Sequence, residues 1–541
     1  MKGFRLSRNP LRVIVNQKSS AAIRKHALMS LWQLIRLVDE DDDGLLSGSA
    51  YATAGVVDRL ARTARPWSAT LVRLGLTALA RSRNGDGSWG NPHARDEYRV
   101  VPTLAVVCAL RGLDAAVPAH HEWVGAAIRR GSRFLFADPE VFAPTRLPGL
   151  DAVEYTIPSL LDRLHDLTGT IADGFGPALQ RARMLQQANA GRCADLRSRA
   201  LAGDRAAWRE FPLELLTAPP RGWAGLPVRN GAVSSSPVLT ATVISAPGSE
   251  IPGAERYLRR EALRHRGLWP VLAPTAELER ATAAALFARI GLPLPPGLTA
   301  SLCASLRLAL DADPPVGVAR PPGTDRTALA DTDRAALAVF ALNCWNDAAD
   351  RRSPPDLPST ASTLATAHIL EALTTVARSR EIDRRRADFA VRALVETQEP
   401  DGHWADRRVA SPYPPTAAAT MALARAIESE FCAEALLAVS RSIAWLLAVQ
   451  RPDGSWGIWH PTTEETACVV HALCTCVNPR AERVVAAALR RAHHFLAGSY
   501  DASETDAVRT PLWHYEDLGS PLRLERLATL TALLLSGAPV P

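Results

Sequence analysis

Apolar residues along most of the chain recur at intervals of three and four, and polar residues fill the positions between them. This spacing places the apolar side chains on one face of an α-helix, whereas the alternation typical of strands is scarce. Clear helical windows lie at 391–396, 443–449, 467–476 and 524–535. Clusters of Pro, Gly, Asp or Ser bound these windows, and such clusters end helices. The pattern therefore predicts an all-α protein.

One short unit occurs three times in the chain. Residues 398–404 (QEPDGHW) and 450–456 (QRPDGSW) are two copies, and residues 83–89 (RNGDGSW) form a third with Arg in place of Gln. In each copy a helix ends, Asp-Gly turns the chain, and Trp offers a large flat surface with one N–H donor. A single turn of this kind is usually structural, but three copies at helix ends form a specific signature.

The three units resemble the QW repeats of the terpene cyclase and protein prenyltransferase superfamily, whose helix pairs close into double-layered α-barrels. Further segments resemble, in order, one branch: the class II diterpene cyclases of the copalyl diphosphate synthase type, in their bacterial form. These segments are SAYATA at 49–54, RVVPTLA at 99–105, IPSLL at 157–161, VSSSP at 233–237, ATAHILEAL at 365–373, ASPY at 410–413, TEETA at 463–467 and LWHYEDL at 512–518. The resemblance covers about residues 45–535 and implies two double-layered α-barrels.

The resemblance also implies a division into domains. A basic N-terminal arm spans 1–19, a β domain spans 20–65 plus 298–541, and an inserted γ domain spans 66–297. A stretch rich in Pro and Gly at 291–297 marks the second boundary by composition alone. The sequence holds no DDxxD motif with a matching second metal motif, so the resemblance implies no class I α domain.

The catalytic acid of this family is the middle Asp of a DxDDTA motif, and it protonates the terminal alkene of a prenyl chain while the diphosphate stays attached. The match here is 331–336 (DTDRAA), which makes Asp333 the general acid and Asp331 its supporting carboxylate. Arg334 takes the place of the family's next Asp. A guanidinium within about 4 to 6 Å of Asp333 would favour the ionised carboxylate, whereas burial would favour the protonated acid. Because successive helical residues point about 100° apart, Arg334 can instead bind Asp331 or the substrate diphosphate.

Other positions of the site follow from the same resemblance. The family's Asn that orients the acid falls at Thr366, whose hydroxyl makes one hydrogen bond with less geometric control. The structural alternative for residues 331–334 is a helix N-terminal cap, where Asp is favoured. The acidic run 39–43 could bind a cation, but a charge run beside a glycine is most often a solvated loop.

The substrate needs donors for its diphosphate and aromatic faces for its carbocations. The candidates for substrate binding are Arg334, Arg407, Arg408, Trp404, Tyr413 and Trp459. Arg407 and Arg408 could equally lie at a solvated helix end instead of binding the diphosphate. The repeat tryptophans could pack outside the cavity instead of contacting the substrate. The resemblance implies that Mg²⁺ binds together with the diphosphate, and no residue is assigned as its ligand.

Composition and charge agree with this class. The chain has 541 residues, 47% of them hydrophobic and 22% charged, as in soluble globular proteins of two or three domains. The net charge of +6 comes mostly from residues 1–38, whose charged residues are all basic. For a chain of 541 residues this net charge is too small to imply nucleic-acid binding. Without an apolar run of membrane length or a signal core, we expect a cytoplasmic protein. The eight cysteines show no metal or disulfide spacing.

The leading hypothesis is class II cyclisation of geranylgeranyl diphosphate, or of farnesyl diphosphate, to a bicyclic labdane- or drimane-type diphosphate. A second hypothesis is a degenerate barrel that binds an isoprenoid or a protein, since Arg334, Ala52, Gly55 and Glu516 depart from the family pattern. A protein prenyltransferase β-like subunit is the third, and it would need a zinc site that the cysteines do not suggest.

Two further partners follow from these hypotheses. The product would pass to a downstream class I terpene synthase or phosphatase. Residues 21–38 form an amphipathic basic helix, which is either the first helix of the β domain or an anchor that gives peripheral membrane contact through the basic N-terminal region.

Overall fold

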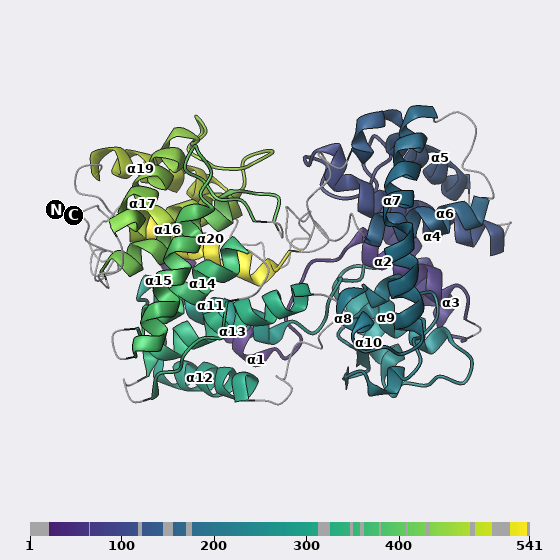
Figure 1. Ribbon diagram of the computed structural model, residues 1–541, viewed down its shortest axis with the longest axis horizontal. Helices are drawn as coiled ribbons and strands as arrows, with labels where there is room; N and C mark the ends of the chain where they lie inside the picture. Colours follow the sequence, from purple (N-terminus) through teal and green to yellow (C-terminus); the bar gives the residue numbers. More distant parts are fainter. Residues whose placement is uncertain are drawn as a thin grey trace.

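The structure is a computed structural model of the chain. It describes residues 21–537 apart from 64, 117–121, 144–154, 169–175, 312–324, 347–349, 358–361, 378–379, 407–408, 429–432, 477–481 and 500–519. The described residues form helices and one short antiparallel sheet of β1 (Val228–Arg229) and β2 (Ala232–Val233), so the all-α prediction is confirmed. Figure 1 shows two groups of helices, here called the first and second barrels, lying side by side.

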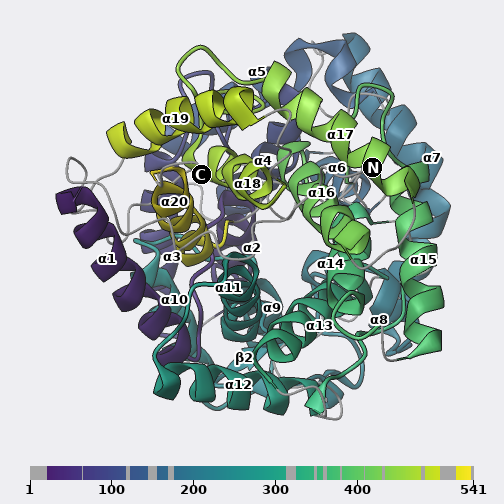
Figure 2. The same cartoon turned by 90° about the vertical axis from the view of Figure 1, so that its left-hand side faces the viewer.

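The first barrel, on the left in Figure 1, has two layers of helices. Its inner helices are α11 (Ala276–Ile290), α13 (Asp325–Trp345), α14 (Thr363–Leu373), α16 (Tyr413–Glu428), α18 (Thr463–Thr475) and α20 (Leu522–Ser536). Each packs against the next and α20 returns to α11, so these helices form the closed ring seen in Figure 2. Outside the ring lie α1 (Ala21–Glu40), α12 (Pro296–Asp311), α15 (Glu381–Glu396), α17 (Ala433–Ala448) and α19 (Glu482–Gly498).

The second barrel is built around α2, which packs against α3, α4 and α9. Its α-helices are α2 (Ala50–Leu60), α3 (Ser68–Arg81), α4 (Asp96–Ala116), α5 (Glu122–Ala137), α6 (Ile157–Thr168), α7 (Gly176–Leu201), α8 (Ala207–Glu210), α9 (Pro237–Ser245) and α10 (Ala254–Arg264). Short 3₁₀ helices η1 (Pro139–Phe142), η3 (Leu213–Leu215) and η4 (Trp223–Gly225) complete it. None of the helices in the described part of the chain is long and apolar enough to cross a membrane.

Helix packing divides the chain at other places than the boundaries drawn from the sequence. The sequence assigns residues 20–65 to the β domain, but α2 packs inside the second barrel. It assigns residues 66–297 to the γ domain, but α11 belongs to the ring of the first barrel. The stretch 291–297 only separates α11 from α12 within the first barrel. Pro and Gly end a helix whether or not the next helix joins the same barrel, so composition could not locate the change of barrel.

The repeated turns fasten the end of an outer helix to the start of an inner one. The indole N–H of Trp404 donates to the carbonyl of Leu394 at 2.7 Å, and its backbone N–H donates to Thr416 Oγ1 at 2.9 Å. Trp456 repeats both bonds, and so does Trp89 in the second barrel. Each of these three indole rings is fully buried.

Trp269 forms a fourth fastening of the same kind. Its indole N–H donates to the carbonyl of Leu258 and its backbone N–H to Thr53 Oγ1, both at 2.9 Å. The sequence did not reveal this copy because its turn keeps only Gly267 of the Asp-Gly pair. Gly267 has a φ of +97°, a conformation that favours glycine.

Candidate functional site

The predicted general acid lies on the inner ring of the first barrel, against a histidine of the neighbouring helix. Asp333 belongs to α13 and His368 to α14, and Nδ1 of His368 contacts Oδ1 of Asp333. Both side chains are 15% exposed, so the carboxyl is sheltered from water but remains reachable. An imidazole in direct contact with a carboxyl group can fix the orientation of that group through a hydrogen bond.

His368 thus makes the contact that the sequence assigned to Thr366. Both residues belong to segment 365–373, but the match to the family's Asn pointed to Thr366, two positions earlier on the helix. Thr366 is buried on α14, and its backbone N–H donates to the carbonyl of Ser362 at the start of that helix. The signal that could have found the pair is chemical: a histidine in a segment expected to face a catalytic carboxyl.

Residues 331–334 lie well inside a helix. α13 begins at Asp325, so neither Asp331 nor Asp333 caps its N-terminus, and the capping alternative is wrong. The side chain of Asp331 lies outside the described residues. Arg334 is buried, with 7% of its surface exposed.

A buried carboxylate one helical turn after His368 connects three helices of the ring. Glu371 of α14 accepts from Arg289 of α11 at 2.6 and 2.9 Å, and Arg425 of α16 lies 3.1 Å from its Oε1. Burial alone would raise the pKa of Glu371, but the guanidinium groups of Arg289 and Arg425 outweigh it and hold the pKa below its ordinary value. Glu371 is therefore ionised in the folded protein at neutral pH. The sequence reasoning missed this cluster because its members come from three distant segments.

The same part of the ring holds a neutral histidine. His471 of α18 is buried, and its Nε2 lies 2.9 Å from Thr531 Oγ1 of α20. Burial, aided by the charge of Arg289, lowers the pKa of His471 to about 3. His471 therefore adds no positive charge to the ring at neutral pH.

The predicted aromatic liners occupy different places. Trp404 has no exposed surface and packs in its repeat turn, so it takes the packing role that was the alternative to substrate contact for the repeat tryptophans. Tyr413 starts α16 with its ring 5.4 Å from that of Trp445, and burial raises its pKa to about 12. Trp459 meets Tyr98 of the second barrel edge-on at 5.1 Å between ring centroids. Arg407 and Arg408 lie outside the described residues.

A cavity of about 410 Å³ lies where the start of α18 approaches the second barrel. Asn91 and His93 line it from the second barrel, and His460, Thr463 and Glu464 from the first. The rings of His93 and His460 lie 4.1 Å apart between centroids. Burial, and next the charge of His93, lower the pKa of His460. The N-terminal end of the ring is thus the end that faces the second barrel.

The described residues offer no protein ligand set for the expected Mg²⁺. Among them, no group of three or more His, Cys, Asp and Glu side chains is placed to hold a metal ion. Asp406, beside the predicted diphosphate arginines, accepts from Ser362 Oγ at 2.8 Å and from the backbone N–H of Leu364 at 2.9 Å, so it serves the start of α14.

Comparison with known proteins adds relatives for the whole chain. Residues 349–467 match the family described as "Squalene-hopene cyclase C-terminal domain". The ent-copalyl diphosphate synthase of Streptomyces sp. strain KO-3988 is 31% identical, over 96% of this chain and 97% of that protein. The labda-7,13-dienyl diphosphate synthase of Streptomyces clavuligerus is also 31% identical, over 96% and 95%. The structure of ent-copalyl diphosphate synthase from Streptomyces platensis superposes with a TM-score of 0.73 at 31% identity, covering 95% of this chain and all of that one.

The Glu371 cluster predicts a pH-dependent stability. Glu371→Gln should lower the free energy of unfolding by about 3 to 5 kcal/mol at neutral pH, because it removes the buried carboxylate that neutralises two partly buried guanidinium groups. The exposed Glu381, which pairs with Arg385 on α15, gives the control Glu381→Gln, with an expected loss below about 1 kcal/mol. Because the folded pKa of Glu371 is depressed, its contribution is present above the unfolded carboxyl pKa and fades as pH falls. Denaturant titrations that give equal losses for both variants would contradict this role.

Proposed function

We propose that this chain, which belongs to the class II diterpene cyclases, converts geranylgeranyl diphosphate to a bicyclic labdane-type diphosphate that keeps its diphosphate group. Two relatives in Streptomyces are named as synthases of ent-copalyl diphosphate and of labda-7,13-dienyl diphosphate, which supports the diterpene substrate. Farnesyl diphosphate, with a drimane-type product, is the alternative substrate. The product would pass to an enzyme that ionises or hydrolyses the diphosphate, such as a class I terpene synthase or a phosphatase.

The reaction in this proposal begins with proton transfer from Asp333. The carboxyl proton goes to the terminal alkene, whose π electrons form the new C–H bond and leave a tertiary cation. The next double bonds attack this cation in turn and close two rings. The last cation then loses a proton, which forms a new double bond and offsets the proton that Asp333 donated. The C–O bond to the diphosphate stays intact, so the net reaction is an isomerisation.

The contact between Asp333 and His368 is the observation that carries this proposal. It orients a carboxyl group on the inner ring, at an exposure that substrate can reach. Asp331 would support the acid from the same helix. Arg334 would bind the diphosphate or Asp331, because neighbouring helical residues point about 100° apart and turn its side chain away from Asp333.

The proposal also assigns the remaining substrate contacts. Tyr413 and Trp459 would offer aromatic faces to the carbocations, and Arg407 or Arg408 would assist in binding the diphosphate. Trp404 supports the turn before α16 instead of contacting substrate. Mg²⁺ would accompany the diphosphate, held mainly by its oxygens.

Replacing the acid tests the reaction directly. Asp333→Ala should lower cyclisation by at least about 100-fold with the fold retained, because the proton donor is lost. His368→Asn, which keeps a hydrogen-bonding side chain, should lose less activity than His368→Ala, and the exposed Asp195→Ala serves as control. Purified protein is incubated with geranylgeranyl or farnesyl diphosphate, with Mg²⁺ or with a chelator, and the dephosphorylated products are identified by gas chromatography and mass spectrometry. Full turnover by Asp333→Ala would refute the assignment, and an inactive wild type would favour the non-catalytic barrel.

Arg334 distinguishes two modes of initiation. If it binds the diphosphate or Asp331, the wild type should be active and Arg334→Asp should lose about 1.5 to 3 kcal/mol of substrate binding or transition-state stabilisation. If it holds Asp333 ionised, the wild type should be inert near neutral pH and Arg334→Asp should gain activity. Steady-state kinetics of both proteins separate these results, and identical rates and products would refute both roles.

We further propose that α1 contacts membranes with its outer face while its inner face belongs to the barrel. Leu31, Ile35 and Val38 are fully buried, which supports the interpretation of α1 as a core helix. Met29 and Leu37 are half exposed on the outside, and the basic residues of 1–38 add attraction to anionic lipid.

Vesicle binding tests this surface. Full-length protein should sediment with vesicles of anionic phosphatidylglycerol in preference to neutral phosphatidylcholine. The double variant Met29→Gln, Leu37→Gln should bind anionic vesicles at least about tenfold more weakly, because two apolar side chains no longer enter the interface. The exposed Met184 of the second barrel gives the control Met184→Gln. Equal binding by all three proteins would exclude α1 as the contact.

A further inference from the structure

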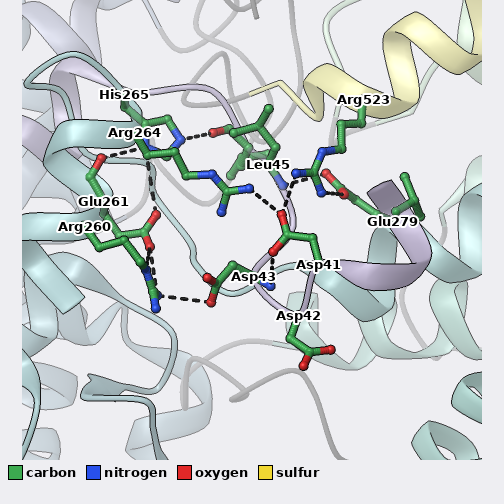
Figure 3. Close-up of polar contacts among 12 residues, drawn as sticks. Asp41, Asp42, Asp43, Leu45, Arg260, Glu261, Arg264, His265, Glu279 and Arg523 are labelled. Carbon is green, nitrogen blue, oxygen red and sulfur yellow. Dashed lines mark hydrogen bonds and ion pairs between the residues drawn. The ribbon is translucent and has the colours of Figure 1, made fainter. Parts of the chain in front are cut away.

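The segment 41–49 joins α1 to α2 and crosses from one barrel to the other; we name it the strap. On the first barrel, the backbone N–H of Leu45 donates to Glu279 Oε1 and that of Ser47 to the carbonyl of Ser520, both at 2.7 Å. On the second barrel, the backbone N–H of Ser49 donates to the carbonyl of Trp269 at 2.9 Å. Figure 3 shows the polar contacts around it. The strap is therefore held by both barrels.

The acidic run that the sequence suggested to be a solvated loop or a cation site is instead paired with arginines. Asp41 contacts Arg264 of the second barrel and Arg523 of the first, as Figure 3 shows. Asp43 pairs with Arg260 at 3.1 Å. Burial alone would raise the pKa of Asp41, but its hydrogen bonds and the two guanidinium groups keep it below the ordinary value. Asp41 thus joins the two barrels by charge.

His265 ties the strap to α10 through both ring nitrogens. Its Nδ1 lies 2.8 Å from the carbonyl oxygen of Glu261, and its Nε2 lies 2.7 Å from the carbonyl oxygen of Leu46 in the strap. Carbonyl oxygens accept hydrogen bonds but cannot donate them, so both nitrogens need a proton to make both bonds. A neutral ring would leave one nitrogen lone pair facing a carbonyl oxygen in a site that is only 5% exposed.

Charged side chains from several elements surround His265. The charged groups beside His265 on α10 and in the strap are Arg260, Arg264, Glu261, Asp41 and Asp43. Of the helices packed against α10, α3 places Arg81 on the carbonyl of Arg266, with its side chain exposed, and α9 has no charged residue. Arg523 of α20 also pairs with Asp41, so each of these three carboxylates has a guanidinium partner. The two carbonyl contacts therefore carry the argument for a doubly protonated ring.

We propose that His265 is a proton-dependent latch between the barrels, which holds the strap while its ring is doubly protonated and releases it when one ring proton is lost. The latch is closed at lower pH and opens as pH rises. Asp41 has the opposite dependence, because its pairs persist above the ordinary carboxyl range and fail only in acid. The contact between the barrels is therefore most stable in the pH range above the protonation of Asp41 and below the loss of a ring proton from His265.

Hydrogen exchange in the full-length protein tests the latch. Between about pH 6 and about pH 9, exchange of the Leu45, Ser47 and Ser49 amides in the wild type should rise about tenfold to a hundredfold beyond its intrinsic pH dependence. His265→Gln, which offers donors at one end only, should exchange fast already at about pH 6 and show no such transition. His494→Gln, altered at an exposed position of α19, should behave as the wild type. Equal strap protection in wild type and His265→Gln would overturn the proposal.

A second measurement remains decisive if His265→Gln fails to fold. In wild-type protein with ¹⁵N-labelled histidine, the two ring nitrogens of His265 should both give signals of protonated nitrogen at about pH 6. These signals are assigned to His265 by their absence from the conservative variant His265→Asn. Alternatively, through-space contacts of the ring with Leu46 and Glu261 assign them. A single neutral tautomer at that pH would refute the latch.

Discussion

The closed ring of the first barrel depends on one hydrogen-bonding arrangement at the turns between outer and inner helices. An α-helix ends with carbonyl groups that have no partner in the helix itself. The indole N–H of Trp404 satisfies Leu394 near the end of α15, and that of Trp456 satisfies Leu446 near the end of α17. Because the backbone N–H of each tryptophan is bound by a threonine of the following inner helix, every such turn fixes where the next inner helix begins. The inner helices then share one orientation, and their N-terminal ends gather at the side of the second barrel.

This shared orientation brings the candidate site together. Asp333 lies two turns into α13 and His368 between one and two turns into α14, so adjacent parallel helices place them at matching depth. One turn deeper on α14, Glu371 ties this helix to α11 and α16 through arginines. A carboxyl that must keep one orientation benefits from a histidine whose own helix cannot shift. The buried ion cluster therefore stabilises the frame on which the proposed acid depends.

Local patterns in the sequence predicted the helices and the repeated turns well, since each depends on residues close together in the chain. The windows at 443–449 and 524–535 fall on α17 and α20 almost entirely. Features built from distant segments were not predictable in the same way. The acidic run at 39–43 looked solvated because its partners, Arg264 and Arg523, lie hundreds of residues away. Likewise α2 and α11 carry no local mark of the barrel in which they pack.

The charges inside the ring also constrain where a carbocation could form in the proposed reaction. Arg289 and Arg425 place two positive charges against the single carboxylate of Glu371, and both guanidinium groups lie over the ring of Phe340 at 5.9 and 5.1 Å. A cation beside them would be repelled strongly in a medium of low dielectric constant. The neutral state of His471 avoids adding a third positive charge. Carbocations are therefore less destabilised near the N-terminal ends of the inner helices, on the side of Asp333 and the second barrel. They are more destabilised near Glu371 and beyond it toward the C-terminal ends of these helices.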